Sequence, residues 1–454
     1  MFNKVLIANR GEIAVRIIRA CQEMEIETVA IYSEADKDAL HVQLADESVC
    51  VGPDKASDSY LNMHHILSAA ITTGAQAIHP GFGFLAENSL FAEMCEECSI
   101  EFIGPSSRII EAMGNKINAR KLMIEAEVPV IPGSDGEVSD LAEATRIAKE
   151  IGYPLMLKAA AGGGGKGIRK VFDASQLQEQ FLSAQSEARL AFGNDQMYLE
   201  KIIYPAKHIE VQVLGDKYGH VIHLGERDCS LQRQNQKVLE EASAFSLSDN
   251  LRQKIAQAAV KASLAVSYES AGTIEFLVDE SGHFYFMEMN TRIQVEHPIT
   301  EMITGVDIVK WQLDIAQGKP LNINQAEIEF TGYAIECRIN AENPQFNFAP
   351  SPGVITKLHF PGGLGVRIDS AVYQNYMIPS FYDSMIAKVI VHGSTREEAL
   401  LKMRRALHEL SIEGVITNQF FQMDLLSHPN MIVGDYDTAF LQDLFLKDWV
   451  STED

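Results

Sequence analysis

The chain has 454 residues, of which 46% are hydrophobic and 22% charged, as in ordinary soluble proteins of about three domains. Its net charge of −24 argues against a nucleic-acid-binding protein, which would carry a basic face, and against electrostatic anchoring to a membrane. No apolar run reaches membrane-spanning length, so membrane insertion is not expected, and residues 1–8 are typical of a short strand rather than a signal peptide. Six cysteines in so long a chain do not indicate a disulfide framework, and we expect a cytoplasmic protein.

The first hundred residues alternate between short apolar runs and an amphipathic run. They predict a helix over residues 12–24 and strands at residues 4–8, 28–32, 75–79 and 101–103. This alternation is typical of an α/β domain with a parallel sheet. Polar turns at 9–12 and 79–84 follow two of the strands, and ligands of open α/β sheets bind at the carboxyl ends of strands.

A glycine run at residues 161–167 separates two predicted strands, at 154–160 and 168–172. It is not a P-loop, because Gly167 follows Lys166 where a Ser or Thr is required. It is not a dinucleotide-binding fingerprint either, because it opens a strand rather than a helix. We predict a flexible glycine hairpin that closes over phosphate groups, with an unliganded surface hairpin as the alternative. The unit continues with a predicted helix at 174–190 and a strand at 196–203.

A β-hairpin is predicted where residues 272–279 and 284–287 are rich in β-branched and aromatic side chains. If Ser281-Gly282 forms a two-residue loop, Glu275 lies directly opposite Glu288. Opposed carboxylates repel each other in a bare sheet, whereas a divalent cation such as Mg²⁺ would bind both beside phosphate oxygens. A solvated sheet face, or a register shifted by one residue, is the alternative.

Polar side chains then alternate with mostly apolar ones along residues 288–296. If this run is extended, its polar side chains face one way and Met289, Ile293 and Val295 face the other. The polar face would carry Glu288, Asn290, Arg292, Gln294 and Glu296. Carboxylate, amide and guanidinium groups on one face suit a metal-bound phosphate beside a small anion.

After about residue 330 the chain becomes strand-rich again. We predict strands at residues 333–340, 353–359 and 385–392, and helices at 395–410 and 418–426. This mixture is typical of an α+β domain.

Six motifs, in this order, resemble those of one family. They occupy residues 4–14, 79–85, 162–167, 226–230, 288–298 and 336–342. With them the chain is similar to the ATP-grasp superfamily and, more narrowly, to biotin carboxylase, the ATP-dependent subunit of acetyl-CoA carboxylase. The resemblance covers nearly the whole chain. It implies an N-terminal parallel α/β domain (1–113), an ATP-grasp core with a mobile lid (114–330, lid about 131–203) and a C-terminal α+β domain (331–454).

The resemblance also implies an activity and a set of site residues. Biotin on a carrier protein would be carboxylated with bicarbonate and ATP through carboxyphosphate, the first half-reaction of acetyl-CoA carboxylase. ATP would be held by Lys116, Lys158, Gly164, Gly165, Glu200, Lys201, Ile202, Ile203, His208, Gln232, Asn235, Glu275 and Glu288. Mg²⁺ or Mn²⁺ would be bound by Glu275, Glu288 and Asn290, and bicarbonate or biotin by Lys237, Arg292, Gln294, Val295 and Arg338. The catalytic residues would be Glu296, Arg292, Arg338 and Lys237.

Two of these roles depend on charge. Glu296 would remove the proton of bicarbonate, and a base works best with a pKa near neutrality, whereas the adjacent Arg292 would lower that pKa. Arg338 would stabilise the enolate-like oxygen of biotin through its guanidinium. For Arg338 the alternative is a salt bridge with Glu336 or Glu342.

Some positions depart from the family pattern. Asn235 stands where many relatives carry a histidine near the nucleotide, and Phe82 where a tyrosine is expected. Residues 243–246 replace a proline-rich segment. These departures concern fine contacts with ATP rather than the class of the protein.

The expected partners also follow from the resemblance. The chain contains no Met-Lys dipeptide, the usual biotin attachment motif, so we expect a separate biotin carboxyl carrier protein and separate carboxyltransferase subunits. A homodimer is expected, with Arg19, Glu23 and Arg367 at positions associated with the dimer contact.

Other functions remain as alternatives. Acetyl-CoA is the expected final acceptor, but biotin carboxylase subunits of pyruvate and propionyl-CoA carboxylases share these motifs. Another ATP-grasp ligase, working through an acylphosphate, is a second possibility, and a non-catalytic nucleotide-binding subunit is a third. The complete set of charged motif residues argues against the third.

Overall fold

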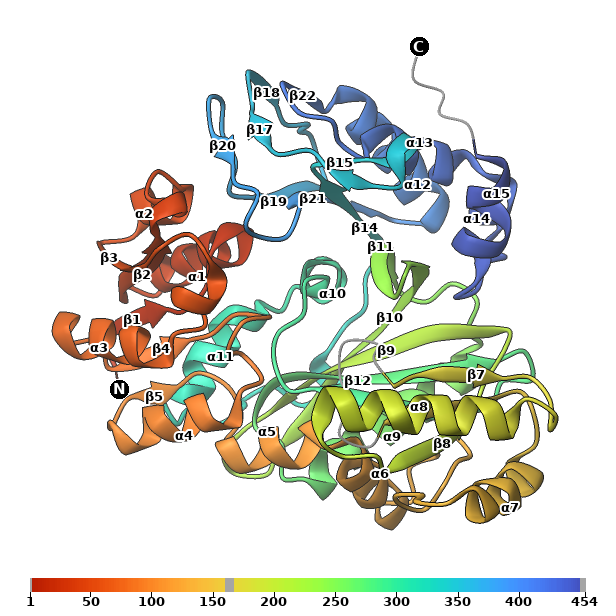
Figure 1. Cartoon of the computed structure of the whole chain (residues 1–454). Coiled ribbons are helices and arrows are strands. Elements are labelled where there is room, and N and C mark those ends of the chain that lie inside the picture. Colours follow the sequence, from red (N-terminus) through yellow and green to blue (C-terminus); the bar gives the residue numbers. More distant parts are fainter. Residues whose placement is uncertain (1, 160–166, 450–454) are drawn as a thin grey trace.

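The computed structural model describes residues 2–159 and 167–449, which form three groups of elements (Figure 1). The N-terminal group is built on a five-stranded parallel sheet, in the order β3-β2-β1-β4-β5, which confirms the predicted α/β domain. Its strands are β1 (Lys4–Ile7), β2 (Glu27–Ser33), β3 (Glu47–Gly52), β4 (Ala77–His79) and β5 (Glu101–Phe102). The helices of this stretch are α1 (Gly11–Glu23), α2 (Leu40–Leu44), α3 (Met63–Thr73), α4 (Ser89–Glu97) and α5 (Ser107–Gly114).

The burial of the strands explains which of them the sequence predicts. In the central strand β1, Val5, Leu6 and Ile7 are all fully buried, as in parallel sheets with both faces covered. The edge strand β3 has only one buried residue, Val51, and its Glu47 is exposed. Strand β3 therefore lacks the apolar run that reveals the others.

The two polar turns after β1 and β4 lie side by side. Nδ2 of Asn9, in the first turn, donates hydrogen bonds to the backbone oxygens of Pro80 and Phe82 in the second, both at 2.7 Å. Both turns line the cavity described below. The carboxyl edge of this sheet therefore faces the functional site, as the α/β pattern predicts.

An eight-stranded antiparallel sheet forms the centre of the molecule, in the order β13-β12-β9-β10-β11-β14-β21-β19. Its strands are β9 (Ala206–Gly215), β10 (Val221–Arg233), β11 (Gln236–Ala242), β12 (Ser270–Asp279), β13 (Phe284–Asn290), β14 (Tyr333–Asn340), β19 (Val366–Ser370) and β21 (Met385–Gly393). Strands β11 and β14 are paired, so the sheet continues across the predicted domain boundary at residue 331. The helices of this part are α6 (Lys116–Glu125), α9 (Asp249–Ala265), α10 (His297–Thr304) and α11 (Ile308–Ala316).

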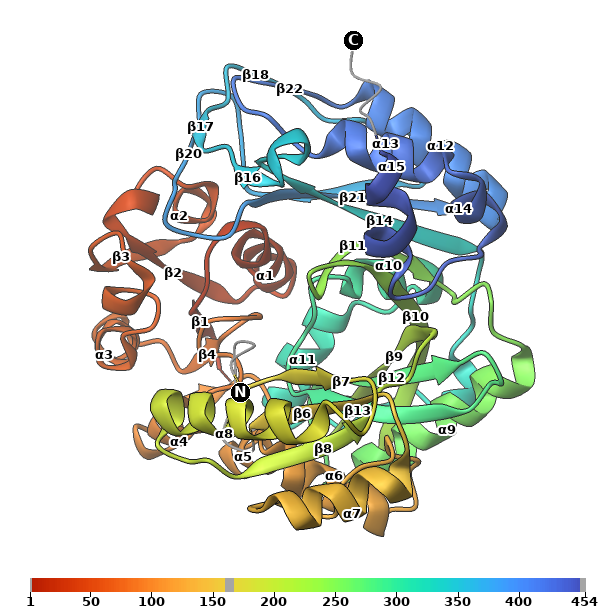
Figure 2. The ribbon, with the colours of Figure 1, turned by 45° about the vertical axis from the view of Figure 1, so that its right-hand side comes forward.

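A smaller sheet, in the order β7-β6-β8, lies beside the central one (Figure 2). It consists of β6 (Leu155–Ala159), β7 (Arg169–Val171) and β8 (Met197–Lys201), with helices α7 (Leu141–Ile151) and α8 (Leu177–Phe192). Strands β6 and β7 are antiparallel on either side of the glycine run, which confirms the flanks of the predicted hairpin. Lys166 and the predicted ATP contacts Gly164 and Gly165 lie outside the described residues.

The last strands of the central sheet, β14, β21 and β19, pack against helices α12 (Arg396–Glu409) and α13 (Gln419–Ser427), in agreement with the predicted α+β arrangement. The predicted strand at 353–359 is two short strands, because its halves pair with different partners. Strand β17 (Gly353–Val354) pairs with β20 (Met377–Ile378), and β18 (Lys357–His359) with β22 (Ser411–Glu413). The remaining strands and α-helices are β15 (Glu342–Asn343), β16 (Ala349–Pro350), α14 (Pro429–Val433) and α15 (Leu446–Asp448). Within residues 2–159 and 167–449, no helix combines the length and apolar character that a membrane crossing requires.

Candidate active site

One cavity of about 1240 Å³ is lined by the turns at the edge of the N-terminal sheet, by the smaller sheet and by the central sheet. Every predicted site residue within the described ranges lines it. These are Lys116, Lys158, Glu200, Lys201, Ile202, Ile203, His208, Gln232, Asn235, Lys237, Glu275, Glu288, Asn290, Arg292, Gln294, Val295, Glu296 and Arg338. The structure thus brings the predicted set together, while the role of each residue stays a prediction.

The acidic hairpin has the predicted pairing but a different loop. Glu275 is the register partner of Glu288, as predicted. The loop has three residues, 280–282, rather than two, and Gly282 takes a φ of +80°, a conformation that favours glycine. A bulge at Met287 compensates for the longer loop and restores the predicted register at the acidic pair.

A row of charged side chains crosses four neighbouring strands. Arg227 on β10 is the register partner of Glu210 on β9, which in turn pairs with Glu275 on β12. Glu288 on β13 ends the row. Three carboxyl groups in adjacent strands repel one another, so the cations around them decide whether the row is stable.

Arg227 holds this row in place through hydrogen bonds from its guanidinium. Its side chain is fully buried. Its guanidinium donates to Glu210 Oε1, Gln212 Oε1, Thr273 Oγ1, Gln294 Oε1 and Thr300 Oγ1, at 2.5 to 3.2 Å. A guanidinium has five N–H donors, so Arg227 has none left for a substrate and instead orients Glu210 and Gln294.

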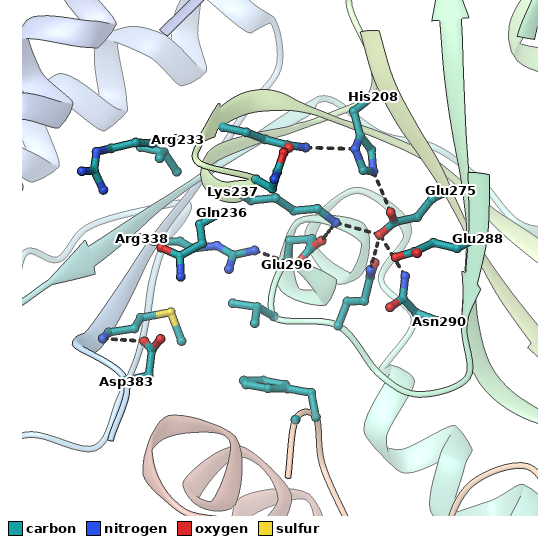
Figure 3. A pocket seen from close by; sticks show the side chains of 18 of the residues that line it. His208, Arg233, Gln236, Lys237, Glu275, Glu288, Asn290, Glu296, Arg338 and Asp383 are labelled. Atoms are coloured by element: carbon teal, nitrogen blue, oxygen red, sulfur yellow. Dashed lines mark hydrogen bonds and ion pairs between the residues drawn. The ribbon is translucent and has the colours of Figure 1, made fainter. Parts of the chain in front are cut away.

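Lys237 binds three carboxylates in the site, and Figure 3 shows its contacts with Glu275 and Glu296. Its Nζ lies 2.6 Å from Glu210 Oε2, 3.1 Å from Glu275 Oε1 and 2.6 Å from Glu296 Oε1. Burial acts to lower the pKa of Lys237, but these carboxylates outweigh it and raise the pKa well above its usual range. Two compact groups of potential metal ligands occur here, His208-Glu210-Glu275 and Glu210-Cys229-Glu296. Both include Glu210, whose two oxygens already contact Arg227 and Lys237, so neither is a suitable metal site.

Of the predicted metal ligands, Glu275 is already in contact with Lys237 and His208, whereas Glu288 has no ion pair shorter than 3.9 Å among the described residues. The Glu288 side chain is 41% exposed, and Asn290 Nδ2 donates to Glu275 Oε1 at 2.9 Å. Burial raises the pKa of Glu288, and the charge of Glu275 raises it further. This repulsion is what a divalent cation would relieve, and carboxylate and amide oxygens are ligands that Mg²⁺ and Mn²⁺ accept, so the residues present fit such an ion.

The polar run at 288–296 is not one extended strand. Strand β13 ends at Asn290 and a loop leads from it into α10, so the prediction of an extended run is wrong beyond that residue. The Thr291 N–H donates to Glu87 Oε1 at 3.0 Å, a side chain of the N-terminal domain, rather than to a neighbouring strand. The remaining polar side chains of the run, Arg292, Gln294 and Glu296, still line the cavity.

The predicted base, Glu296, is held by two cations and is only 1% exposed. Lys237 Nζ lies 2.6 Å from Oε1, and Arg338 Nη2 lies 2.9 Å from Oε2. Burial acts to raise the pKa of Glu296, but Lys237, Arg338 and Arg227 outweigh it and hold the pKa well below its usual range. Glu296 is therefore ionised and able to accept a proton.

Arg292 contacts other groups than Glu296. Its Nε donates to Glu87 Oε2 at 2.8 Å, and its Nη2 donates to Asn290 Oδ1 at 2.9 Å. The lowering of the Glu296 pKa, expected from Arg292, thus comes mainly from the two cations that touch the carboxylate.

Arg338 forms a fork between two acidic side chains. It lies 2.5 Å from Glu240 Oε1 through Nη2 and 2.7 Å through Nε, besides its contact with Glu296. The alternative salt bridge with Glu336 or Glu342 is wrong, since neither of them contacts this guanidinium. Burial raises the pKa of Glu240 to about 7, although Arg338 opposes this shift.

The part of the cavity beside Lys116 and Lys158 is more open. The Lys116 side chain is 63% exposed, and its Nζ lies 3.9 Å from Glu288 Oε2. Lys158 forms an ion pair with Glu200 on β8. Lys158 and Glu200 belong to the smaller sheet, and both line this part of the cavity.

His208 links the acidic hairpin to the neighbouring strand β10. Its Nδ1 bonds Gln232 Nε2 at 2.9 Å, and its Nε2 lies 3.0 Å from Glu275 Oε2. Burial acts to lower the pKa of His208, but the charge of Glu275 outweighs burial and raises it. This side chain is therefore part of the acidic site rather than an isolated core histidine.

The backbone conformation explains why Asn235 departs from the histidine that many relatives carry at this position. Arg233 pairs with Gln236, so Gln234 and Asn235 form a two-residue hairpin loop, with φ of +52° and +65°. Turns with two left-handed residues favour asparagine. Phe82, the second departure, lines the cavity.

Three acidic residues of the site were missed by sequence analysis. Glu210 lies on β9 in the alternating series His208, Glu210, Gln212, a period-2 signal that could have revealed it. Glu240 lies beside Glu241 on β11, and the pair resembles an ordinary surface charge run. Glu87 lies in a loop some 200 residues before its partner Arg292, a contact between domains that no local pattern indicates.

Comparisons with known proteins agree with this geometry. Biotin carboxylase, N-terminal domain, matches residues 1–110, and Biotin carboxylase C-terminal domain matches residues 336–443. Between them, the ATP binding domain of the carbamoyl-phosphate synthase L chain matches residues 115–324.

Individual relatives match over almost the whole chain. Biotin carboxylase 1 of Bacillus subtilis is 56% identical over 443 residues, covering 97% of this chain and 98% of the relative. The 2-oxoglutarate carboxylase small subunit of Hydrogenobacter thermophilus is 52% identical, covering 98% and 94%. The biotin carboxylase domain dimer of that carboxylase, solved with MgADP, ADP and bicarbonate, superposes with a TM-score of 0.92 at 51% identity, covering 99% and 100%. The chain therefore belongs to the biotin carboxylase family.

Proposed function

We propose that this member of the biotin carboxylase family uses ATP, Mg²⁺ or Mn²⁺ and bicarbonate to carboxylate biotin on a separate carrier protein. One observation carries the proposal. The acidic pair Glu275 and Glu288 shares one cavity with Lys237, Glu296 and Arg338. A place for metal-bound phosphate thus adjoins a place where a small anion meets a base and cations.

Glu296 is the base of the first step. It is ionised, and bicarbonate, itself an anion, competes with it for the nearby cations. Each cation contact that moves from Glu296 to the substrate raises the basicity of Glu296, which favours transfer of the bicarbonate proton to it.

The deprotonated bicarbonate then attacks the γ-phosphorus of ATP, and the bond to ADP breaks, which gives carboxyphosphate and ADP. A divalent cation held by Glu275, Glu288 and Asn290 would neutralise phosphate charge at this point. Carboxyphosphate releases CO₂ and phosphate, and the phosphate removes the ureido proton of biotin. The guanidinium of Arg338 stabilises the enolate-like oxygen that forms, and the biotin nitrogen attacks CO₂.

The partners belong to the same proposal. We propose a separate biotin carboxyl carrier protein and separate carboxyltransferase subunits as partners. Acetyl-CoA is the proposed final acceptor, which places the chain in fatty acid synthesis, and a cytoplasmic homodimer is the proposed form. A solved relative is described as a dimer. The predicted dimer residues Arg19 and Glu23 are exposed on α1, while Arg367 is partly exposed and binds Glu301 and Asp369 within the chain.

A second acceptor class is supported by the relatives. Proteins named as parts of pyruvate and 2-oxoglutarate carboxylases are 53% and 52% identical, close to the 56% of the Bacillus biotin carboxylase. Reconstitution with the chain's own carrier and carboxyltransferase subunits, followed by the transfer of labelled carboxyl groups to acetyl-CoA or to the 2-oxo acids, decides between them.

The activity itself is tested with the purified chain, ATP, Mg²⁺, bicarbonate and free biotin. ADP release should require bicarbonate and should rise with biotin. ADP release that needs an amino or carboxylate substrate instead would indicate another ATP-grasp ligase. Nucleotide binding without turnover in any mixture would indicate a non-catalytic subunit.

A further inference from the structure

The backbone amide of Val295 is a free donor at the cavity wall. Val295 lies in the loop between β13 and α10 and lines the cavity. No described residue accepts a hydrogen bond from its N–H. Because buried or partly buried amides are nearly always paired, this N–H is available for a ligand such as bicarbonate.

Both carbonyl groups that flank this amide are fixed by buried side chains. The Gln294 oxygen accepts a hydrogen bond from His297 Nδ1 at 2.7 Å, and the Val295 oxygen accepts one from Lys388 Nζ at 2.8 Å. The Gln294 carbonyl and the Val295 N–H belong to one planar peptide group, so fixing the oxygen fixes the direction of the N–H. The second contact fixes the next peptide group, which leads to Glu296.

His297 can play this part because its ring is neutral and has one tautomer. It is fully buried, and burial, with the charges of Lys388, Arg16 and Arg367, holds its pKa well below the usual range. A carbonyl oxygen only accepts, so the proton of the neutral ring is on Nδ1. The Nε2 atom has no hydrogen-bond donor among the described residues and lies 4.0 Å from Glu301.

Lys388 joins the three parts of the molecule at this loop. It is fully buried on β21, in the C-terminal part. Its Nζ lies 3.1 Å from Oε1 of Glu12, at the start of α1 in the N-terminal domain. Glu12 belongs to a turn that sequence analysis singled out for ligand binding, and its contact is this lysine. The Val295 carbonyl, from the ATP-grasp part, is the third member.

We propose that His297 and Lys388 are positioning residues that hold the Val295 N–H toward bicarbonate, with Glu12 as the counter-ion that keeps Lys388 in place. The proposal rests on the proposed function, because it assigns bicarbonate to that amide. Neither side chain needs to touch the substrate. Both act through the backbone that touches it, so their loss should weaken bicarbonate binding more than nucleotide binding.

The first test is Lys388→Met, which keeps the volume and removes the donor. We expect the KM for bicarbonate to rise ~10-fold, the effect of one lost hydrogen bond, with the KM for ATP changed less than ~2-fold. Lys402→Met is the matched control, since Lys402 donates to the carbonyl of His392 at 2.5 Å at the far end of the same strand. This control should leave both KM values unchanged. Glu12→Gln combined with Lys388→Met keeps the buried site neutral if the single variant is unstable.

The second test is the pair His297→Asn and His297→Leu. These side chains have nearly the same shape, and only asparagine places an N–H donor close to the Nδ1 position. We expect His297→Leu to raise the KM for bicarbonate ~10-fold and His297→Asn to restore most of the lost affinity. A role in packing alone would make the two variants equal.

The two proposals fail in different ways. A wild-type chain without bicarbonate-dependent ADP release would overturn the proposed function. An active wild-type chain whose Lys388→Met and His297→Leu variants keep the normal KM for bicarbonate would overturn the positioning role alone. Equal increases in the KM values for ATP and bicarbonate would also overturn it, because they indicate general distortion.

Discussion

The two ends of the cavity differ in how their charges are held. At the end proposed to bind bicarbonate, called the bicarbonate end, the side chains of Lys237 and Glu296 are 13% and 2% exposed and bind each other at 2.6 Å. At the end proposed to bind the nucleotide, called the nucleotide end, the side chains of Lys116 and Glu288 are 63% and 41% exposed and lie 3.9 Å apart. At the bicarbonate end the charges are paired with each other within the protein, whereas at the nucleotide end they are exposed to solvent and available to a ligand.

This difference indicates a division of labour. Charges that are fixed and shielded from water need no rearrangement during the reaction and stabilise charge strongly. Exposed charges contribute little to the folded protein and act when a ligand brings opposite charge to them. Changes at the buried end should therefore affect turnover and stability, and changes at the exposed end should affect nucleotide affinity.

The largest effect is expected from Glu296→Gln, which keeps the size of the side chain and one of its two acceptor oxygens but removes the base. Bicarbonate-dependent ADP release should fall ~10³-fold or more, because general base catalysis typically contributes 10² to 10⁴. The dissociation constant of ATP, measured by calorimetry, should stay within ~3-fold. Near-normal turnover in this variant would show that another group takes the proton.

Lys237→Met tests whether the buried end depends on its own cation. Removing the ammonium leaves Glu210, Glu275 and Glu296 without a shared partner. Breaking a buried pair in this way typically costs about 3–5 kcal/mol, so thermal unfolding should shift to clearly lower temperature without any ligand. A variant as stable as the wild type would mean that the three carboxyl groups are protonated or solvated, and the contrast between the two ends would disappear.

Arg338→Ala, also at the bicarbonate end, separates the carboxylation of biotin from the binding of ATP. Biotin-dependent turnover should fall about 10²-fold, because the guanidinium proposed to stabilise the biotin enolate is lost. Binding of ATP should be unchanged, since Arg338 contacts Glu240 and Glu296 rather than the nucleotide end. Loss of ATP affinity in this variant would show that Arg338 contributes to nucleotide binding, and the proposed role toward biotin would be wrong.

Sequence reasoning predicted the contents of the cavity better than its architecture. The pairing of Glu275 with Glu288 was predicted from a two-residue loop, and it holds because the bulge at Met287 compensates for the third loop residue. Alternation within a strand and the size of a loop are local properties, and the sequence carries them. A compensating bulge depends on tertiary packing, so no sequence pattern indicated it.

The remaining gaps concern contacts between distant segments. Lys237 was expected to bind bicarbonate, but the three carboxylates around it come from β9, β12 and the loop before α10. Likewise Glu87 and Arg292 meet across 205 residues of chain. Resemblance to a family names such residues, but only the folded chain shows which charges neutralise each other.

A smaller effect, with a definite sign, is expected from Glu240→Gln. Burial raises the pKa of Glu240 from 4.5 to about 7, so the native state binds a proton that the unfolded chain releases between these values. Its contribution to stability is therefore complete below about pH 4.5 and is lost as the pH rises through about 7, at most ~3 kcal/mol. Glutamine cannot ionise, so the variant should gain stability relative to wild type between about pH 5 and about pH 8. Parallel melting temperatures across this range would show that Glu240 stays ionised beside Arg338.

The smallest effect is expected at the exposed end, from Lys116→Gln. An exposed ion pair of this length contributes less than about 1 kcal/mol to folding, so the melting temperature without ligand should hardly change. The KM for ATP should nevertheless rise ~3- to 10-fold, because the ammonium meets its main partner only when phosphate arrives, and the increase should shrink at high salt. The matched comparison is Lys158→Gln, whose lysine is already paired with Glu200 and is 25% exposed. In Lys158→Gln the loss of ATP affinity should come with a measurable loss of stability, since the ammonium of Lys158 forms an ion pair with Glu200 even without ligand. If Lys116→Gln destabilises the free protein as much as Lys158→Gln does, the nucleotide end is as preorganised as the bicarbonate end.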